Sequence, residues 1–563
     1  MMTLREVARA SLLSSITIAA IACTSGDATT RRPNERLAAT TPNFTPVPIG
    51  SVTEPLGGWL DASCPVDPEL IERVLRGYHK GRSPDVMFIP RTPNFVGGFV
   101  GTGHSGPWDY LQEVPLVFYG PGFIRPVGEI STPEPATVAD IVPTLAELLD
   151  VDAGDVDGRV LEEVLVPEPS RPGRPRLIVT IAWDGGGTNV LDTWPGHWPN
   201  LRSLMQRGAS MQGAIVGSSP SITPATHTTM GTGVFPATHG AVGISLRENG
   251  EILDSFAGHS ADDVEVPMLG DTFDLTTNNE AKIGLLAYKG WHLGMMSHGT
   301  DFPGGDEDIA VFVDEEEKLV TGRHYSIPAY LDQIGGLDDA VREIDLTDGE
   351  RDDTWRGHEI LADPTLRRDT PVWVLHQTKL IKELLRRERF GADDVPDLFF
   401  TNYKQIDEAG HTWNMLSPEV ADVVRYSDEG LRELETFLDA TVGEKQWVMV
   451  ITADHGQQPA AEASRGWPIS VRELIADIAD HFGIEESSLA TSQVGVYMLP
   501  GAAGITPEEV SDFVIDYRIR DNLDADRDIE IPESYRSRYD EPVMSAAFPA
   551  RSSRRVLACA RSR

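Results

Sequence analysis

Four apolar runs stand out along the chain, and each ends at a polar residue or a turn. They read VPLVFYG before Pro121, RLIVTIAW before Asp184, DLFFTNY before Lys404 and QWVMVITA before Asp454. Runs that are apolar almost without interruption are typical of parallel strands buried on both faces. We therefore predict four strands of one central sheet. The residues that follow them would line its carboxyl edge, where open α/β sheets bind ligands.

Helical patterns separate these runs. Ser417 and Pro418 form a cap and first-turn pair. Apolar residues follow at helical spacing, namely Val420, Val423, Val424, Leu431, Leu434 and Leu438. Asp140 is expected to cap the run IVPTLAELL that comes after it. Strands that alternate with helices predict an α/β fold, with a mostly parallel central sheet and helices on both of its faces.

The first residues have the pattern of an export signal. Arg5 and Arg9 precede an apolar run over residues 10–22, which is short for a membrane span. Small residues then lead to Cys23, which resembles the lipidation site of a bacterial lipoprotein. We predict that the signal peptide 1–22 is removed and that acylated Cys23 anchors the protein to the outer face of the bacterial cytoplasmic membrane. Simple cleavage would leave the protein secreted.

Composition shifts divide the rest of the chain. Residues 23–55 are rich in Thr, Pro and Asn, which predicts a disordered tether. The segment VPEPSRPGRPR, residues 166–176, predicts a linker between two blocks. The folded part is therefore expected to consist of residues 56–165 and residues 177–563.

The net charge limits the partners. The 563 residues include 48 Lys and Arg against 87 Asp and Glu, a formal net charge of −39. Such a surface repels nucleic acid and anionic membranes, so we expect no nucleic-acid binding and membrane contact only through a lipid at Cys23. An anionic substrate would need a local positive charge, such as a metal ion, at the site.

Three short motifs place Asp and His where metal ligands could gather. Asp184 follows a strand in TIAWDGGGTNVL, and VITADHGQ sets Asp454 beside His455. In TNYKQIDEAGH, Asp407 and His411 have the spacing D-x-x-x-H. Mixed Asp and His ligands suit Zn²⁺, with Mn²⁺ or Fe as alternatives.

A fourth stretch, GSSPSITPATHTTMGTGVFPATHG over residues 217–240, crowds Ser, Thr and Gly around two histidines. Thr223 lies four residues before His227 within it. A hydroxyl is a weak nucleophile at its own pKa. Whether one of these hydroxyls is a nucleophile therefore depends on which groups lie beside it.

Taken in this order, the four motifs resemble the type I phosphodiesterase/nucleotide pyrophosphatase branch of the alkaline phosphatase superfamily. Members of that branch carry a Thr nucleophile four residues before a His, followed by a TG…P…HG turn, as TPATHTTMGTGVFPATHG does here. The resemblance implies two divalent metal ions. One would be bound by Asp184, Asp454, His455 and the Thr223 oxygen, and the other by Asp407, His411 and one further histidine.

That further histidine is expected downstream of Asp454, where His481 lies in an amphipathic helical pattern typical of a surface. The segment GTGHSGPWDYLQEVPLVFYGPG, residues 101–122, resembles instead the late segment that carries this ligand in the superfamily. The resemblance thus implies His104 as the ligand. HSG stands here where HGS is usual.

This placement implies a circular permutation, in which residues 56–165 correspond to the usual C-terminal part of the catalytic domain. An independent N-terminal domain that only resembles the motif is the alternative. Cys64 and Cys559 flank the break in the order, so in an exported protein the permutation implies a disulfide between them; two unpaired cysteines are the alternative. The resemblance is thinnest over residues 301–394, which we expect to form a cap over the site.

The resemblance implies an exported hydrolase of small phosphoric esters, monoesters or diesters, that acts through a phospho-enzyme at Thr223. Lys289 and His298 are candidate substrate contacts, whereas Lys404 is expected to extend beside a strand end without touching substrate. A phosphonate hydrolase of the same superfamily and a non-catalytic surface lipoprotein that keeps the fold as a binding module are the alternatives.

Overall fold

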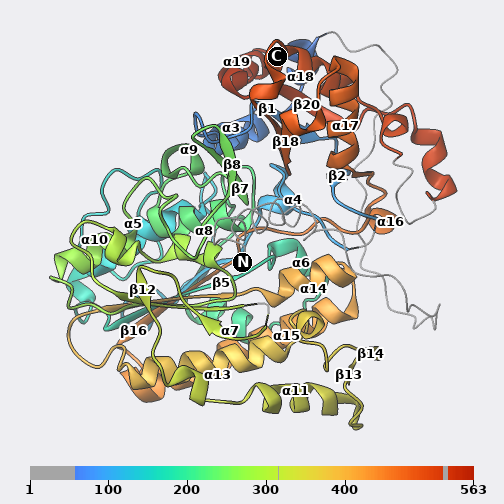
Figure 1. Cartoon of the computed structure of the whole chain (residues 1–563). Coiled ribbons are helices and arrows are strands. Elements are labelled where there is room, and N and C mark those ends of the chain that lie inside the picture. The colour runs from blue at the N-terminus through green and yellow to red at the C-terminus, as the bar shows by residue number, and fades with distance from the viewer. Residues whose placement is uncertain (1–57, 100, 315, 524–530) are drawn as a thin grey trace, which may run out of the picture.

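The structure is a computed structural model and describes residues 58–99, 101–314, 316–523 and 531–563. The predicted signal peptide, the lipidation site Cys23 and the tether lie outside these residues. Among the described residues, no helix is both long enough and apolar enough to span a membrane. Two sheets of different size organise the molecule (Figure 1).

The larger sheet has ten strands in the order β11-β10-β9-β15-β5-β16-β3-β6-β4, with β12 paired to β10. Its strands are β3 (Leu116–Tyr119), β4 (Gly128–Ile130), β5 (Leu177–Trp183), β6 (Ala209–Met211), β9 (Ile283–Leu286), β10 (Asp308–Val313), β11 (Leu319–Val320), β12 (Tyr325–Ser326), β15 (Asp397–Tyr403) and β16 (Trp447–Thr452).

The four predicted strands are confirmed as β3, β5, β15 and β16. β5 pairs in parallel with β15 and β16, but β3 is antiparallel to β16. A continuous apolar run indicates that a strand is buried on both faces, but it does not determine the direction of the strand. The antiparallel direction of β3 could therefore not be predicted from its sequence.

Helices cover both faces of this sheet, as expected. Along β5, Ile178 and Ala182 enter one apolar core, whereas Val179 and Ile181 enter the other. The first core includes residues of α5 (Ile141–Leu149), α8 (Thr223–Thr232) and α10 (Leu269–Thr276). The second includes residues of α6 (Thr188–Thr193), α7 (Pro199–Arg207), α11 (Leu337–Asp345), α13 (Val372–Arg387), α14 (Gln405–Trp413) and α15 (Pro418–Leu438).

The two predicted caps differ in outcome. Ser417 caps α15 by accepting a hydrogen bond from a backbone N–H of the first turn. Asp140, however, does not cap α5. Its carboxylate accepts hydrogen bonds from the backbone N–H groups of Thr137 and Arg159, each at 2.8 Å. Asp140 therefore closes the preceding 3-10 turn, Val138–Asp140, and ties it to a distant loop.

The smaller sheet has the order β18-β19-β1-β20. Its strands are β1 (Val86–Pro90), β18 (Leu489–Ser492), β19 (Gly495–Met498) and β20 (Met544–Pro549), packed with α2 (Trp59–Ser63), α3 (Pro68–Gly77), α17 (Val471–Phe482), α18 (Pro507–Asp516) and α19 (Ser553–Arg561). β1 lies between two strands from the C-terminal part of the chain, and β3 lies inside the larger sheet. The described residues 58–99 and 101–165 thus contribute strands to both sheets, which argues against an independent N-terminal domain.

The two ends of the described chain lie side by side (Figure 1). A disulfide joins Cys64 to Cys559, as expected, with Cα atoms 5.4 Å apart. α19 packs against α3, and Arg561 forms an ion pair with Glu72.

The described part of region 301–394 is joined to the main fold. β10 and β12 extend the larger sheet, and α13 packs between α11 and α15. Many of its apolar residues complete the second core, and a cap over the site stays a prediction. Short pairs of strands complete the fold: β2 (Phe95–Val96) with β17 (Pro468–Ile469), β7 (Ser245–Glu248) with β8 (Glu251–Asp254), and β13 (Thr354–Trp355) with β14 (His358–Glu359).

Candidate metal centre

Three adjacent strands bring polar residues to one edge of the larger sheet. Asp184 directly follows β5, Lys404 directly follows β15, and Asp454 comes just after β16. Because β5 pairs in parallel with both neighbours, the carboxyl ends of the three strands meet. The sheet itself therefore assembles side chains from three distant parts of the sequence.

The first group of candidate ligands consists of Asp184, Asp454 and His455. One ligand atom from each lies within 4.8 Å of the others, and all three residues are fully buried. His455 Nε2 is 3.3 Å from Asp454 Oδ2 and 3.7 Å from Asp184 Oδ1. Asp454 Oδ2 and His455 Nε2 have no hydrogen-bond partner. Burial, together with the charge of Asp454, raises the pKa of Asp184 to about 6. Buried ligand atoms without partners are what a metal ion requires.

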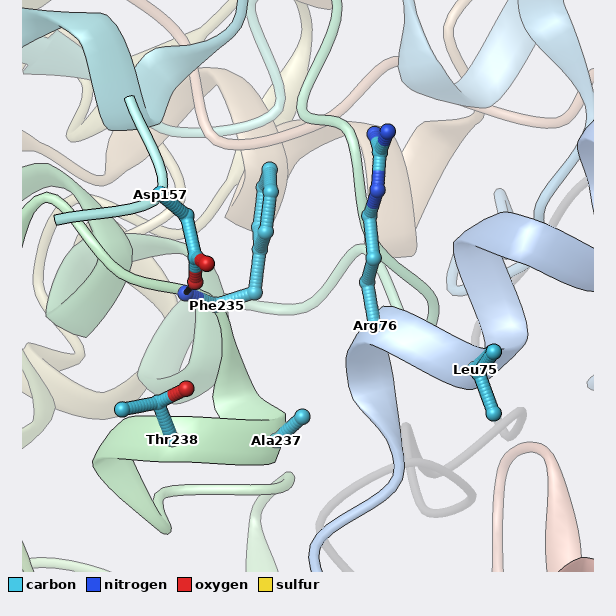
Figure 2. Close-up of a pocket in the computed structure, with 6 residues that line it drawn as sticks. All are labelled: Leu75, Arg76, Asp157, Phe235, Ala237 and Thr238. Carbon is cyan, nitrogen blue, oxygen red and sulfur yellow. Dashed lines mark hydrogen bonds between the residues drawn. The ribbon is translucent and has the colours of Figure 1, made fainter. Parts of the chain in front are cut away.

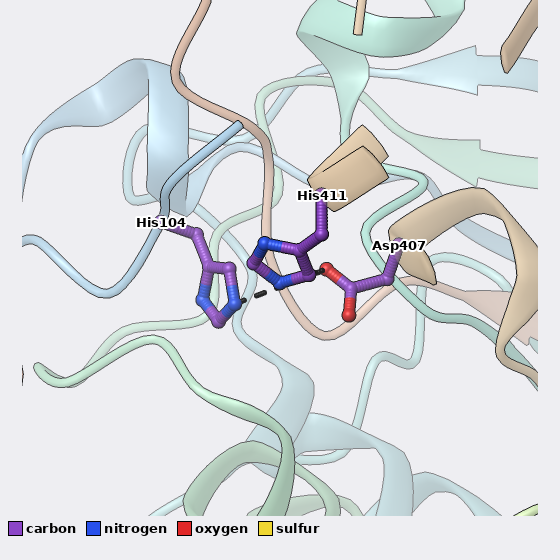
Figure 3. A group of neighbouring side chains, drawn as sticks. All are labelled: His104, Asp407 and His411. Atoms are coloured by element: carbon purple, nitrogen blue, oxygen red, sulfur yellow. Dashed lines mark ion pairs between the residues drawn. The ribbon is translucent and has the colours of Figure 1, made fainter. Parts of the chain in front are cut away.

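The second group consists of His104, Asp407 and His411 (Figure 3), again with one ligand atom each inside 4.8 Å. Asp407 Oδ1 is 3.4 Å from His411 Nε2 and 3.8 Å from His104 Nε2, and it has no hydrogen-bond partner. The D-x-x-x-H spacing lies on α14, so both side chains share one helical face. His104 comes from the loop before the short helix α4 (Asp109–Gln112). The structure thus brings His104 to the place that the resemblance implied.

Backbone carbonyls orient all three histidines. The Nδ1 atoms of His411, His104 and His455 lie 2.8, 3.3 and 3.1 Å from the carbonyl oxygens of Thr102, Ser221 and Gly456, respectively. An Nδ1–H that donates to a carbonyl leaves the Nε2 lone pair for a metal ion. Each ring therefore turns its Nε2 towards its own group of ligands.

The two groups form one site. The rings of His104 and His455 stack with centroids 3.7 Å apart. The side chain of Lys404 bridges the two groups, because its Nζ lies 2.9 Å from Asp184 Oδ1 and 2.6 Å from Asp407 Oδ2. The prediction that Lys404 only extends beside a strand end is therefore wrong. It is 3% exposed, because the sheet edge points its side chain between two carboxylates. Burial opposes its charge, but Asp184 and Asp407 raise the pKa of Lys404 well above its ordinary value.

Thr223 begins helix α8 at this site and is 2% exposed. Its Oγ1 lies 3.5 Å from Lys404 Nζ. Four residues later, His227 Nδ1 donates to Thr223 O at 2.8 Å, and burial lowers the pKa of His227 to about 4, so its ring is neutral. Asn402 Nδ2 donates both to His227 Nε2 at 3.1 Å and to Asp184 Oδ2 at 3.0 Å. This chain of hydrogen bonds fixes the start of α8 against the first ligand group.

The two candidate substrate contacts have different positions. Lys289 Nζ is 2.9 Å from Glu408 Oε1, next to the ligand Asp407, so Lys289 lies at the rim of the site. His298 does not join the site, contrary to the prediction. Its Nδ1 is 2.6 Å from Asp271 Oδ2 and its Nε2 is 3.2 Å from Val264 O, so its ring is held at helix α10.

Sequence reasoning missed two polar residues of the centre, Asn402 and Gln457, the second of which donates to the carbonyl oxygens of Gly185 and Ile406. His292, which lies close to Lys289 in the sequence, has a buried ring with a nitrogen within 4.8 Å of ligand atoms of Asp184 and His227. Asn402 could have been found, because it is a polar residue near the carboxyl end of the mostly apolar strand β15. His292 lies in the 3-10 helix Gly290–Met295.

A separate pocket of about 290 Å³ lies beside the short helix α9 (Pro236–His239) and contains none of these ligands (Figure 2). Its wall pairs Arg76 with Phe235, with the guanidinium carbon 5.0 Å from the ring centroid. Asp157 accepts a hydrogen bond from Phe235 N on the other side. The hollow therefore contributes nothing to the metal centre.

The chain is similar to known proteins in sequence and in structure. Residues 178–541 match the family model described as type I phosphodiesterase / nucleotide pyrophosphatase. Alkaline phosphatase PafA of Elizabethkingia meningoseptica is 21% identical over 384 residues, covering 58% of this chain and 69% of PafA. Alkaline phosphatase PhoV of Synechococcus elongatus is 20% identical over 337 residues, covering 51% and 60%. A solved structure of a PafA mutant superposes with a TM-score of 0.50 and 18% identity, covering 67% of this chain and 85% of that one.

The mostly parallel sheet with Asp and His at its carboxyl edge defines a phosphoric ester hydrolase of the alkaline phosphatase superfamily. Because the family model matches more than half of the chain, the chain belongs to the type I phosphodiesterase / nucleotide pyrophosphatase family. The predicted resemblance is confirmed. The matched residues begin at 178, after the segment that carries His104, so the circular permutation stays a prediction.

Proposed function

We propose that the protein is an exported metal-dependent hydrolase of phosphoric esters, with Thr223 as the nucleophile of a two-metal site. The observation that carries this proposal is the pair of Asp/His groups at one sheet edge, with unpartnered ligand atoms, beside the Thr223 hydroxyl. Asp184, Asp454, His455 and Thr223 Oγ1 would hold one ion, and Asp407, His411 and His104 the other. This donor set suits Zn²⁺, with Mn²⁺ or Fe as alternatives.

The chain's own residues account for the positioning. Bound divalent ions lower the pKa of an oxygen that they contact and offset phosphoryl charge. Thr223 Oγ1 would attack phosphorus as the bond to the alcohol oxygen breaks, and the alcohol leaves with a proton. Water then cleaves the phospho-enzyme and restores the hydroxyl. Thr223 is the first residue of a ten-residue helix, so the free backbone N–H groups of its first turn, such as that of Ala225, would be available to phosphoryl oxygens.

A matched set of assays tests the proposal. Full-length protein should contain about two transition-metal ions per chain, as two-metal hydrolysis requires. Strong chelation should abolish hydrolysis of a chromogenic phosphomonoester and of a chromogenic phosphodiester, and zinc should restore it. The ratio of the two rates assigns the substrate class. Full turnover after verified metal removal would contradict the two-metal mechanism.

Export and lipid attachment are a separate part of the proposal. The pattern before Cys23 supports both, and a disulfide between Cys64 and Cys559 fits an oxidising compartment. Metabolic labelling with a fatty acid should mark the mature protein, and Cys23→Ser should remove the label. A labelled Cys23→Ser protein would contradict the assigned anchor.

A further inference from the structure

Three carboxylates outside the metal centre meet at the far end of helix α10. Asp274 lies in the last turns of α10, Asp306 in the loop before β10, and Asp308 is the first residue of β10. One oxygen from each lies within 4.8 Å of the others. The group, which we call the α10 cluster, shares no residue with the metal centre.

The α10 cluster carries buried negative charge without a cationic partner. Asp274 is 3% exposed and Asp308 is 7% exposed, whereas Asp306 lies at the surface. Across the described parts of the chain, no Lys, Arg or His forms an ion pair with any of the three. Buried carboxylates that lack such compensation are costly unless they take up a proton or bind a cation.

An unused oxygen atom of the cluster points to a ligand. Asp274 is 3% exposed, and its Oδ1 is buried and has no hydrogen-bond partner. Asn279 lies in the turn that follows α10, and its Nδ2 donates to Gly304 O at 3.0 Å. That bond ties the turn to the loop that carries Asp306. The polarity of α10 acts in the same direction, because a helix C-terminus favours positive charge.

The environment also perturbs these carboxyl groups. Burial and the neighbouring charge of Asp306 raise the pKa of Asp274 to about 7. Burial raises the pKa of Asp308 well above its ordinary range, although Ser297 Oγ donates to its Oδ2. At neutral pH without a cation, part of the cluster would have to stay protonated.

From this geometry we propose that the α10 cluster is a calcium site, with Asp274, Asp306 and Asp308 as its ligands. All donors are hard oxygens, and no nitrogen or sulfur ligand is present, which disfavours zinc. Calcium tolerates ligands from separate elements and irregular geometry, whereas magnesium requires a near-ideal octahedron. The ion would fasten the loop of Asp306 to α10 and β10. The inference does not depend on the nucleophile proposed above.

Calorimetry on the full-length protein tests the proposal. The protein is first saturated with zinc, so that the metal centre is filled, and is then dialysed against calcium-free buffer. Titration with calcium chloride should show one additional ion per chain and should raise Tm. Magnesium chloride should bind more weakly. No calcium binding, or tighter binding of magnesium, would overturn the assignment.

Two neighbouring surface residues supply a matched pair of variants. Asp306→Asn removes an exposed ligand without a risk to folding, and should weaken calcium binding by at least about tenfold, because ligand charge sets affinity. Glu307→Gln removes the adjacent charge, which is exposed and outside the cluster, and should bind calcium like the wild type. Phosphoester hydrolysis at saturating zinc should stay unchanged in both. Equal calcium affinity in the two variants would show that the cluster is not the site.

Discussion

Thr223 is one of several buried hydroxyls around the metal centre, and single substitutions distinguish the role of its hydroxyl from those of its neighbours. Thr223→Ala should lose several orders of magnitude in turnover, the scale seen when a covalent nucleophile is removed, while the protein stays folded. Thr226→Ala is the matched control, because Thr226 Oγ1 is buried in the same helix without a hydrogen-bond partner. Steady-state hydrolysis and phospho-enzyme trapping measure both variants. Wild-type turnover in Thr223→Ala would move the nucleophile elsewhere.

Lys404 pairs with two carboxylates, Asp184 and Asp407, each of which would also contribute an oxygen to a metal ion. Without metal, Lys404→Met leaves Asp184 and Asp407 uncompensated and should cost about 3–5 kcal/mol of unfolding free energy, as when one partner of a buried pair is removed. With zinc bound the loss should be much smaller, because the ions replace the ammonium charge. Denaturant unfolding of the metal-free and zinc-loaded proteins gives both values.

A second lysine serves as the control for this prediction. Lys289 pairs with Glu408 at the rim, where its side chain is 34% exposed. Lys289→Met should cost less than Lys404→Met, because Lys289 is partly exposed and the buried carboxylate of Glu408 keeps the charges of Lys404 and Arg368 nearby. Equal losses in the two variants would mean that the position of Lys404 between the ligand groups has no energetic consequence.

At the scale of elements, α8 and α9 are coupled by a neutral histidine. His239, the last residue of α9, accepts from Ala241 N at Nδ1 and contacts Thr229 Oγ1 of α8 at 3.1 Å through Nε2. Burial lowers the pKa of His239 to about 3. The unfolded chain binds this proton near pH 6.5, so stability must fall as the pH drops from about 6.5 towards 3.

A pH series tests this coupling. Between pH 6.5 and 5.0 the wild type should lose about 2 kcal/mol more than His239→Gln, from about 1.4 kcal/mol per pH unit for one group. Urea unfolding of the wild type and of His239→Gln at the two pH values gives the loss of unfolding free energy in each protein, and the two losses are then compared. Parallel pH profiles would show that His239 carries a proton in the folded protein.

The elements also show how far the sequence determines this structure. The strands could be predicted because residues such as those of β5 are apolar on both faces, which only burial explains. Direction could not, since β3 is as apolar as β5 yet antiparallel to its neighbour. The two candidate ligand groups could be predicted because D-x-x-x-H and D-H are local patterns and because the family resemblance implied His104 as the remaining member. The partners of Lys404 and Asp140 could not, because they depend on residues that only the fold brings near.

On the scale of the whole molecule, we propose that the chain is a circular permutation of its family's order. The support is the position of β1 between β19 and β20, and of His104 beside Asp407. Joining Arg563 to Gly58 through about ten Gly and Ser residues, a flexible span, and opening the chain within residues 166–176, should give a folded and active enzyme. Circular dichroism and phosphoester hydrolysis measure the outcome.

The control for this rearrangement carries the same ten residues inserted within 166–176, with the original ends kept. That segment is largely exposed, so insertion should be tolerated. If the insertion variant is active but the relinked one does not fold, the natural ends are needed and the simple permutation is wrong.

The disulfide between Cys64 and Cys559 has a consequence for how the protein responds to proteolysis. It spans 495 residues of sequence, so nearly the whole described chain forms one covalent loop. A protease that cuts the exposed 166–176 segment opens this loop but releases no fragment. The nicked protein should migrate as one band on a gel without reductant and as two bands with it. It should also retain hydrolysis, because both pieces keep their strands in the same two sheets.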